Sequence, residues 1–89
     1  MVQSIGIDVS KGKLDVGLIN LNQTTSNLQC GNDHHSIHSL VKTLQSYQNI
    51  EDIPIVIENT GGYYYGITFA LIEKEFKKVM AKAIHHLLS

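Results

Sequence analysis

The first twenty residues alternate between apolar and polar or small side chains, and this alternation restricts the fold more than any other feature of the sequence. Within residues 2–9, the apolar Ile5, Ile7 and Val9 share one parity, and Ser4, Gly6 and Asp8 share the other. A period of two residues is typical of a β-strand with one buried face. The alternation resumes at residues 14–20, after a turn-like segment at residues 10–13. Because this connection is short, we expect the two strands to form an antiparallel hairpin.

The next segments predict a third strand and a helix. Residues 24–30 alternate more weakly, so we expect a strand near the edge of the sheet. Asn32 or Asp33 is a suitable N-cap for a helix that runs from His34 to about Tyr47. Its apolar residues fall at positions i, i+3, i+4 and i+7, which is one face of a helix. These residues are Ile37, Leu40, Val41 and Leu44.

A short apolar and β-branched run at residues 53–58 predicts a strand buried on both faces, as in a parallel sheet. Pro54 suits the start of such a strand. Thr60 can cap the helix that follows, and residues 77–81 can begin another strand. We expect the buried face of that helix to consist of Tyr65, Phe69, Ile72 and Phe76, so that Tyr65 packs in the core and the adjacent tyrosines are partly exposed.

The expected order of elements is β-β-β-α-β-α-(β). A meander followed by alternating helix and strand gives an α/β fold with a mixed sheet and covering helices. This is the order of the RNase H-like fold, and it is also the start of the sugar-kinase and actin type of ATPase domain. The length of 89 residues favours one domain.

Composition excludes several classes of protein. The chain is 43% hydrophobic and 17% charged, as in soluble globular proteins, and we expect a cytoplasmic location without a membrane span. The net charge of −1 lacks the basic footprint of a self-sufficient nucleic-acid-binding module. The single cysteine, Cys30, excludes an internal disulfide, and we expect it to be a small, buried or half-buried thiol.

Two of the expected strands end in a carboxylate, the first in Asp8 and the fourth in Glu58. If these strands are parallel neighbours, their ends lie about 4.8 Å apart. Ligands of open α/β sheets bind at such strand ends. Like charges this close repel each other unless a cation lies between them, and oxygen ligands favour Mg²⁺ or Mn²⁺. We therefore expect Asp8 and Glu58 to be metal-binding and catalytic residues in phosphodiester cleavage, where such ions act in pairs. The structural alternative for each acid is a solvated carboxylate, or one that caps a turn, at the end of a strand.

Four further residues are candidates for binding nucleic acid. Lys11 and Lys13 lie beside Asp8 in the sequence and can contact a DNA phosphate. Thr60 and Gly61 precede a helix, where backbone N–H groups can hold a phosphate. An exposed turn for the lysines and a tight turn at residues 60–62 are structural alternatives.

Two segments resemble motifs of one family. Residues 5–11, followed by Leu14-Asp15-Val16, resemble the opening of the bacterial insertion-sequence transposases that use a DEDD catalytic motif. Residues 55–63 resemble their second motif, in which an acid on a strand precedes Thr-Gly-Gly-Tyr and a helix. The nuclease domain of this family is similar to the RuvC-like Holliday-junction resolvases of the RNase H-like superfamily. The resemblance spans roughly Ile5 to Val79.

The resemblance implies that Asp8 is the first acid of the motif and Glu58 the second. It implies metal-dependent cleavage and transfer of DNA strands during transposition, with Mg²⁺ or Mn²⁺ as cofactor. It also implies DNA as a partner, a structured RNA encoded by the element as another, and a homo-oligomer of the full-length family.

The sequence departs from the family in its pattern of acidic residues. The family has two later aspartates spaced Asp-x-x-Asp, whereas no aspartate follows Asp52 here. We therefore expect residues 1–89 to form a partial nuclease domain that is incomplete at its C-terminus, lacks part of the catalytic set and is inactive alone. The alternatives are a nucleotide-binding ATPase-type domain and a non-catalytic remnant.

Overall fold

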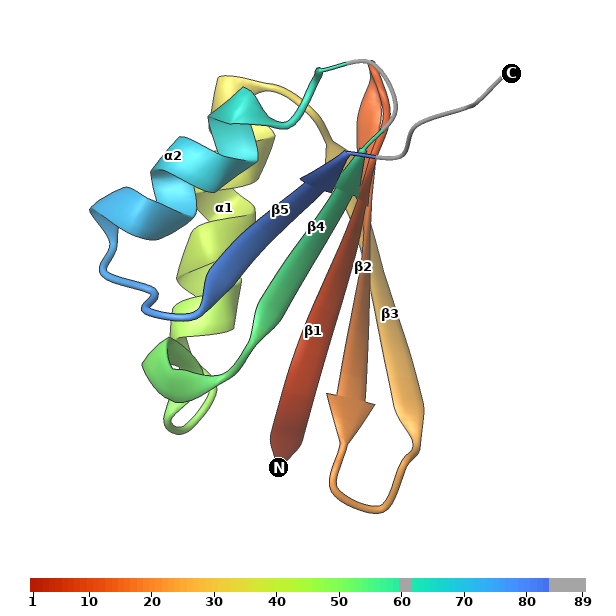
Figure 1. Cartoon of the computed structure of the whole chain (residues 1–89), viewed down its shortest axis with the longest axis vertical. Helices are drawn as coiled ribbons and strands as arrows, with labels where there is room; N and C mark the ends of the chain where they lie inside the picture. The colour runs from red at the N-terminus through yellow and green to blue at the C-terminus, as the bar shows by residue number, and fades with distance from the viewer. Residues whose placement is uncertain (60–61, 84–89) are drawn as a thin grey trace.

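In the computed structural model, which describes residues 1–59 and 62–83, the chain folds into a mixed sheet with two helices (Figure 1). In chain order the elements are β1 (Val2–Val9), β2 (Lys13–Asn20), β3 (Thr25–Gly31), α1 (His34–Gln45), the 3₁₀ turn η1 (Ile50–Asp52), β4 (Ile55–Asn59), α2 (Tyr65–Glu73) and β5 (Val79–Ala83). The sheet has the strand order β3-β2-β1-β4-β5.

The pairing divides the sheet into two halves. β1, β2 and β3 form an antiparallel meander, while β4 is parallel to both β1 and β5. The predicted hairpin and edge strand are confirmed, because β2 follows β1 directly and β3 ends the sheet. The element order confirms the predicted α/β class with the RNase H-like arrangement.

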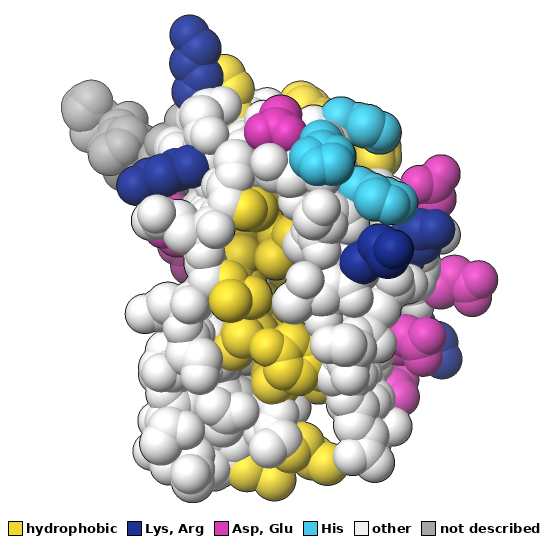
Figure 2. All heavy atoms as spheres, turned by 180° about the vertical axis from the view of Figure 1, so that it is seen from behind, with side chains coloured by type: hydrophobic (Ala, Val, Ile, Leu, Met, Phe, Trp, Pro, Cys, Tyr) yellow, Lys and Arg dark blue, Asp and Glu magenta, His cyan; other side chains and the backbone are white. Residues whose placement is uncertain are grey.

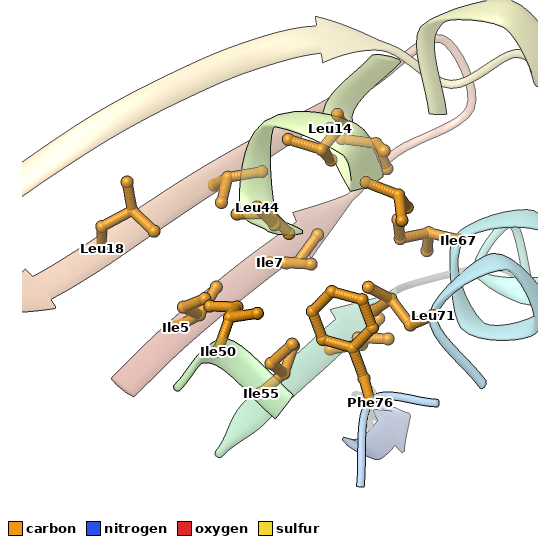
Figure 3. Close-up of a cluster of buried hydrophobic side chains, with 14 of the residues drawn as sticks. Ile5, Ile7, Leu14, Leu18, Leu44, Ile50, Ile55, Ile67, Leu71 and Phe76 are labelled. Carbon is orange, nitrogen blue, oxygen red and sulfur yellow. The ribbon is translucent and has the colours of Figure 1, made fainter. Parts of the chain in front are cut away.

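Both helices pack on the same face of the sheet (Figure 1). The alternation predicted for the first strand decides which side chains they cover, since Ile5, Ile7 and Val9 are buried while Gly6 and Asp8 are exposed. Figure 3 shows the resulting core, in which strand side chains meet those of the helices and of Phe76. No helix or strand among the described residues covers the opposite face of the sheet.

α1 follows its sequence prediction closely. All four predicted core residues are buried, and Asp33 is the N-cap, its carboxylate accepting a hydrogen bond from the Ser36 N–H. Gly31 makes room for this cap, because a Cβ at Gly31 would lie 2.5 Å from the Asp33 carboxylate.

The predicted buried face of α2 is wrong. Tyr65, Phe69 and Ile72 are 58%, 65% and 57% exposed, and the helix packs through Ile67 and Leu71 instead. Phe76 is buried as expected, but it lies beyond the end of the helix. α2 is apolar on more than one side, so helical periodicity alone does not identify the packed side.

The tyrosines next to α2 also differ from the prediction. Tyr64 packs against the core, whereas Tyr65 is exposed. α2 begins at Tyr65 with Tyr64 at the N-cap position, so the cap is not Thr60, which lies outside the described residues. Tyr65 stacks on Tyr64 with ring centroids 4.6 Å apart, and on Phe69 with ring centroids 6.2 Å apart.

β4 is buried on one face only, which corrects the expectation of a strand buried on both. Ile55 and Ile57 are fully buried, but Val56 is half-buried and Glu58 is exposed, because both helices lie on the same side. The strand begins at Ile55, after η1 and Pro54. Within residues 1–59 and 62–83, no helix has the length and apolarity that a membrane crossing needs.

Replacing Ile57 by alanine should lower the free energy of unfolding by about 2–5 kcal/mol, because it leaves a cavity in the core. Ile57 is 0% exposed, whereas Ile19 on β2 is 40% exposed. The same replacement at Ile19 should cost less than about 1 kcal/mol. Urea denaturation of the two variants measures the difference, and equal losses would contradict this assignment of the core.

Replacing Asp33 by alanine should lower the thermal midpoint at neutral pH, because α1 loses its cap. Asp33→Ser keeps an oxygen acceptor and should lose less. The Ser36 N–H and then the Ser36 hydroxyl bond to the carboxylate and lower the pKa of Asp33.

Because the folded pKa of Asp33 is the lower one, its contribution is fully present above the unfolded carboxyl pKa of about 3.9 and disappears as the pH falls through the folded value. The difference between wild type and Asp33→Ala should therefore narrow in acid. A difference that grows with falling pH in thermal melts would show that this account of the cap is incorrect.

Candidate functional site

Asp8 and Glu58 lie side by side at the carboxyl ends of β1 and β4. The parallel ladder pairs Asp8 with Glu58 directly, and it continues one residue further to Val9 and Asn59. Neighbouring strands are about 4.8 Å apart, and paired residues of a parallel ladder point to the same face. Both carboxylates therefore lie on adjacent parallel strands, which is the arrangement on which the sequence-based expectation depended. They also lie on the uncovered face, which the sequence did not predict for the fourth strand.

The two acids belong to a polar row that crosses the sheet. Asp8 is paired on its other side with Asp15 of β2, Asp15 with Gln29 of β3, and Glu58 with Lys82 of β5. The Gln29 side-chain amide donates a hydrogen bond to the Asp15 carboxylate. Asp8, Asp15, Gln29 and Glu58 all line one open groove of about 540 Å³.

Two glycines line this groove beside the polar row. Gly6 of β1 is paired with Gly17 of β2, and Asn27 of β3 follows as the next partner. A Cβ at Gly6 would meet no atom within 4 Å, so the sheet surface there is open. The absence of side chains at both positions lets a ligand approach the backbone closely.

The Asp8 and Glu58 side chains are exposed and make no hydrogen bond or ion pair with other described residues. Their oxygens are thus available to a ligand from solvent. Over residues 1–59 and 62–83, no three His, Cys, Asp or Glu side chains are close enough together to form a metal site. The described residues therefore present a pair of acidic donors and no complete cluster.

Of the four candidates for binding nucleic acid, Lys11 and Lys13 lie at the same end of the sheet as the two acids, and Thr60 and Gly61 lie outside the described residues. Lys11 is exposed in the turn after β1, and Lys13 is the exposed first residue of β2. Both follow Asp8 closely in the chain. Thr60 and Gly61 lie outside the described residues, so their proposed contacts stay predictions.

Asn32 connects the loops at the same end of the sheet. Its side-chain amide donates one hydrogen bond to the Ser10 carbonyl, at 2.9 Å, and another to the Tyr63 carbonyl, at 3.0 Å. Its backbone N–H bonds to the Gly12 carbonyl at 3.1 Å. Ser10 and Gly12 belong to the turn after β1, and Tyr63 belongs to the connection between β4 and α2.

Sequence reasoning did not assign a site role to Asp15 or Asn32. The signal for Asp15 was present, because the alternation of the hairpin places it on the same face as Asp8. No sequence signal distinguishes the loop contacts of Asn32, since its bonds go to backbone carbonyls that any residue carries.

The exposed histidines and the cysteine thiol lie away from the polar row. Figure 2 shows histidine side chains gathered in one patch of the surface, and His34, His35 and His38 of α1 are exposed. Cys30 is half-buried, as expected, in a small groove between β3 and α1 with Leu28 and Leu40. Burial, and then the nearby Asp33 carboxylate, raise the pKa of the Cys30 thiol, which keeps it protonated and weakly nucleophilic.

Comparison with known proteins identifies the family. No curated protein matches the chain. The model of the DEDD transposases of IS110 type, described as a transposase, matches residues 5–86 and so covers both acidic strands and the elements between them. The match agrees with the resemblance carried by the two motifs and favours a transposase over the ATPase-type alternative. The chain therefore belongs to the DEDD transposase family of IS110 type.

Proposed function

We propose that this chain supplies Asp8 and Glu58 as ligands of a divalent cation, Mg²⁺ or Mn²⁺, for cleavage and transfer of DNA strands during transposition of an insertion sequence. The observation that carries the proposal is the direct pairing of Asp8 with Glu58 across the β1–β4 ladder. Family membership supports the transposase role.

The donor set fits such an ion. Both residues offer hard carboxylate oxygens, and both are exposed in an open groove without competing partners among the described residues. Mg²⁺ is commonly held by one or two carboxylates together with substrate phosphates. The groove is open above Gly6 and Gly17, so a phosphodiester backbone has access to the carboxylates.

When bound, a divalent ion lowers the pKa of a coordinated water and stabilises charge on the leaving oxygen. The residues of the chain would hold the ion and orient the DNA strand. Asp8 and Glu58 would fix the ion between neighbouring strand ends, and the ladder would keep their spacing. Lys11 and Lys13, exposed in the adjoining turn, would contact DNA phosphates and align the strand with the acids.

The family's motif has four acidic residues, and two of them match this sequence, Asp8 and Glu58. We therefore propose that the chain contributes half of the acidic site and that strand cleavage needs aspartates that this sequence does not contain. The structured RNA and the homo-oligomer implied by the family belong to the same proposal.

Mn²⁺ binding tests the carboxylate pair directly. Asp8→Asn and Glu58→Gln should each weaken Mn²⁺ binding by at least about tenfold, because each removes one charged ligand. Asp52→Asn removes the same charge in η1, before the start of β4, and should leave the Kd unchanged. Electron paramagnetic resonance titration of free Mn²⁺ gives the Kd values. Equal weakening in all three variants would point to diffuse electrostatics and contradict a site at Asp8 and Glu58.

Lys11→Ala should weaken binding to duplex DNA of arbitrary sequence and reduce the slope of log K against log salt by about 1, because it removes a phosphate contact. Lys13→Ala should behave alike. Lys77→Ala is the matched control, since Lys77 is exposed and precedes β5 at the opposite end of the sheet. Fluorescence anisotropy over a range of salt concentrations measures the slopes, and three identical slopes would rule out the lysine contacts.

A further inference from the structure

We infer that Asn32 is a positioning residue, which limits how far the two acid-bearing strand ends can separate by linking the turn after β1 to Tyr63 in the connection after β4. This inference rests on the proposed function of Asp8 and Glu58. Asn32 is half-buried between β3 and α1, and its side-chain hydrogen bonds go to Ser10 and Tyr63 and not to either acid.

The Asn32 side chain is a bridge between two loops. Its amide group has two N–H bonds, and each is directed at a different carbonyl, that of Ser10 and that of Tyr63. Both acceptors are carbonyl oxygens, so the nitrogen of the amide, and not its oxygen, must face them. The backbone N–H of the same residue holds Gly12, so the turn after β1 is held at two points.

The bridge lies just beyond the end of the β1–β4 ladder. The ladder register ends at Val9 and Asn59, one residue after the two acids. Ser10 is the next residue after β1, and Tyr63 immediately precedes the N-cap of α2. Strand ends fray where the ladder stops, because fewer hydrogen bonds and less packing hold them. Asn32 links the turn after β1 to Tyr63 beyond the end of this ladder, and we expect this link to limit how far the acidic ends can separate.

The residue type is specific to this role. An aspartate has the same shape but would present oxygen to two carbonyl oxygens. An alanine would leave both loops without the bridge. Asn20 offers a matched comparison, because its side-chain amide donates two hydrogen bonds to Thr24, at 3.3 Å each, in the β2–β3 turn at the other end of the sheet.

The test measures Mn²⁺ binding by the full chain with electron paramagnetic resonance. Asn32→Ala should raise the Kd about tenfold, the size of effect that supporting residues have on metal sites. Asn20→Ala should leave the Kd unchanged. Circular dichroism melts of both variants show whether the fold persists. If the effect were only a general loss of stability, both melting midpoints would fall while the Kd values of Asn32→Ala and Asn20→Ala stayed alike.

The outcomes distinguish this inference from the proposed function. A wild type that binds no Mn²⁺, or binds it equally after Asp8→Asn, overturns the proposed function and this inference with it. A wild type that binds through Asp8 and Glu58, with an Asn32→Ala variant of the same Kd, overturns the positioning role alone.

A measurement on the wild type keeps the inference testable if Asn32→Ala does not fold. In a Mg²⁺ titration followed by NMR, the Asn32 side-chain amide signals should shift with the same midpoint as the backbone signals of Asp8 and Glu58, while those of Asn20 stay in place. Asn32 signals that remain fixed while the Asp8 and Glu58 signals move would overturn it.

Discussion

The parallel ladder between β1 and β4 is the interaction on which the rest of the structure depends. It joins the N-terminal meander to the strand-helix-strand half of the chain, because no other strand pairing in the described sheet links these two parts. The connection from β3 to β4 must cross the sheet, and α1 makes that crossing above the core that contains Ile7 and Ile57. The same register that aligns these buried isoleucines also sets Asp8 beside Glu58 on the opposite face.

The two faces of the sheet therefore have different tasks. One parity of each central strand carries isoleucine, leucine or valine into the core beneath the helices. The other parity carries glycines and acids on an open surface. Since the side-chain period of a strand is two, a shift of register by one residue would exchange these sets and lose both the core and the acidic pair. Stability and the candidate site thus depend on the same alignment.

The contrast between α1 and α2 shows where sequence patterns are sufficient. α1 has a single apolar stripe, a carboxylate N-cap and polar residues elsewhere, so only one orientation buries its apolar side chains. In α2, Ile67 and Leu71 are four residues apart, and so are Tyr65 and Phe69, and both spacings are compatible with a buried stripe. The sheet accepts the aliphatic pair, and the aromatic pair is left stacked at the surface.

The sequence by itself determined the order of the elements, the buried parity of β1 and β2, the core face of α1 and the two strands that end in acids, because these follow from local periodicity and capping. Only the tertiary structure decided which side of α2 is buried, that one face of the sheet stays open, and that Gln29 of β3 extends the polar row. It alone also placed the Asn32 amide between two loops. These features depend on contacts between residues that are distant in the chain. The Asn32 contacts leave no local pattern because their acceptors are backbone carbonyls, and the buried side of α2 is not readable because two apolar patterns compete in that helix.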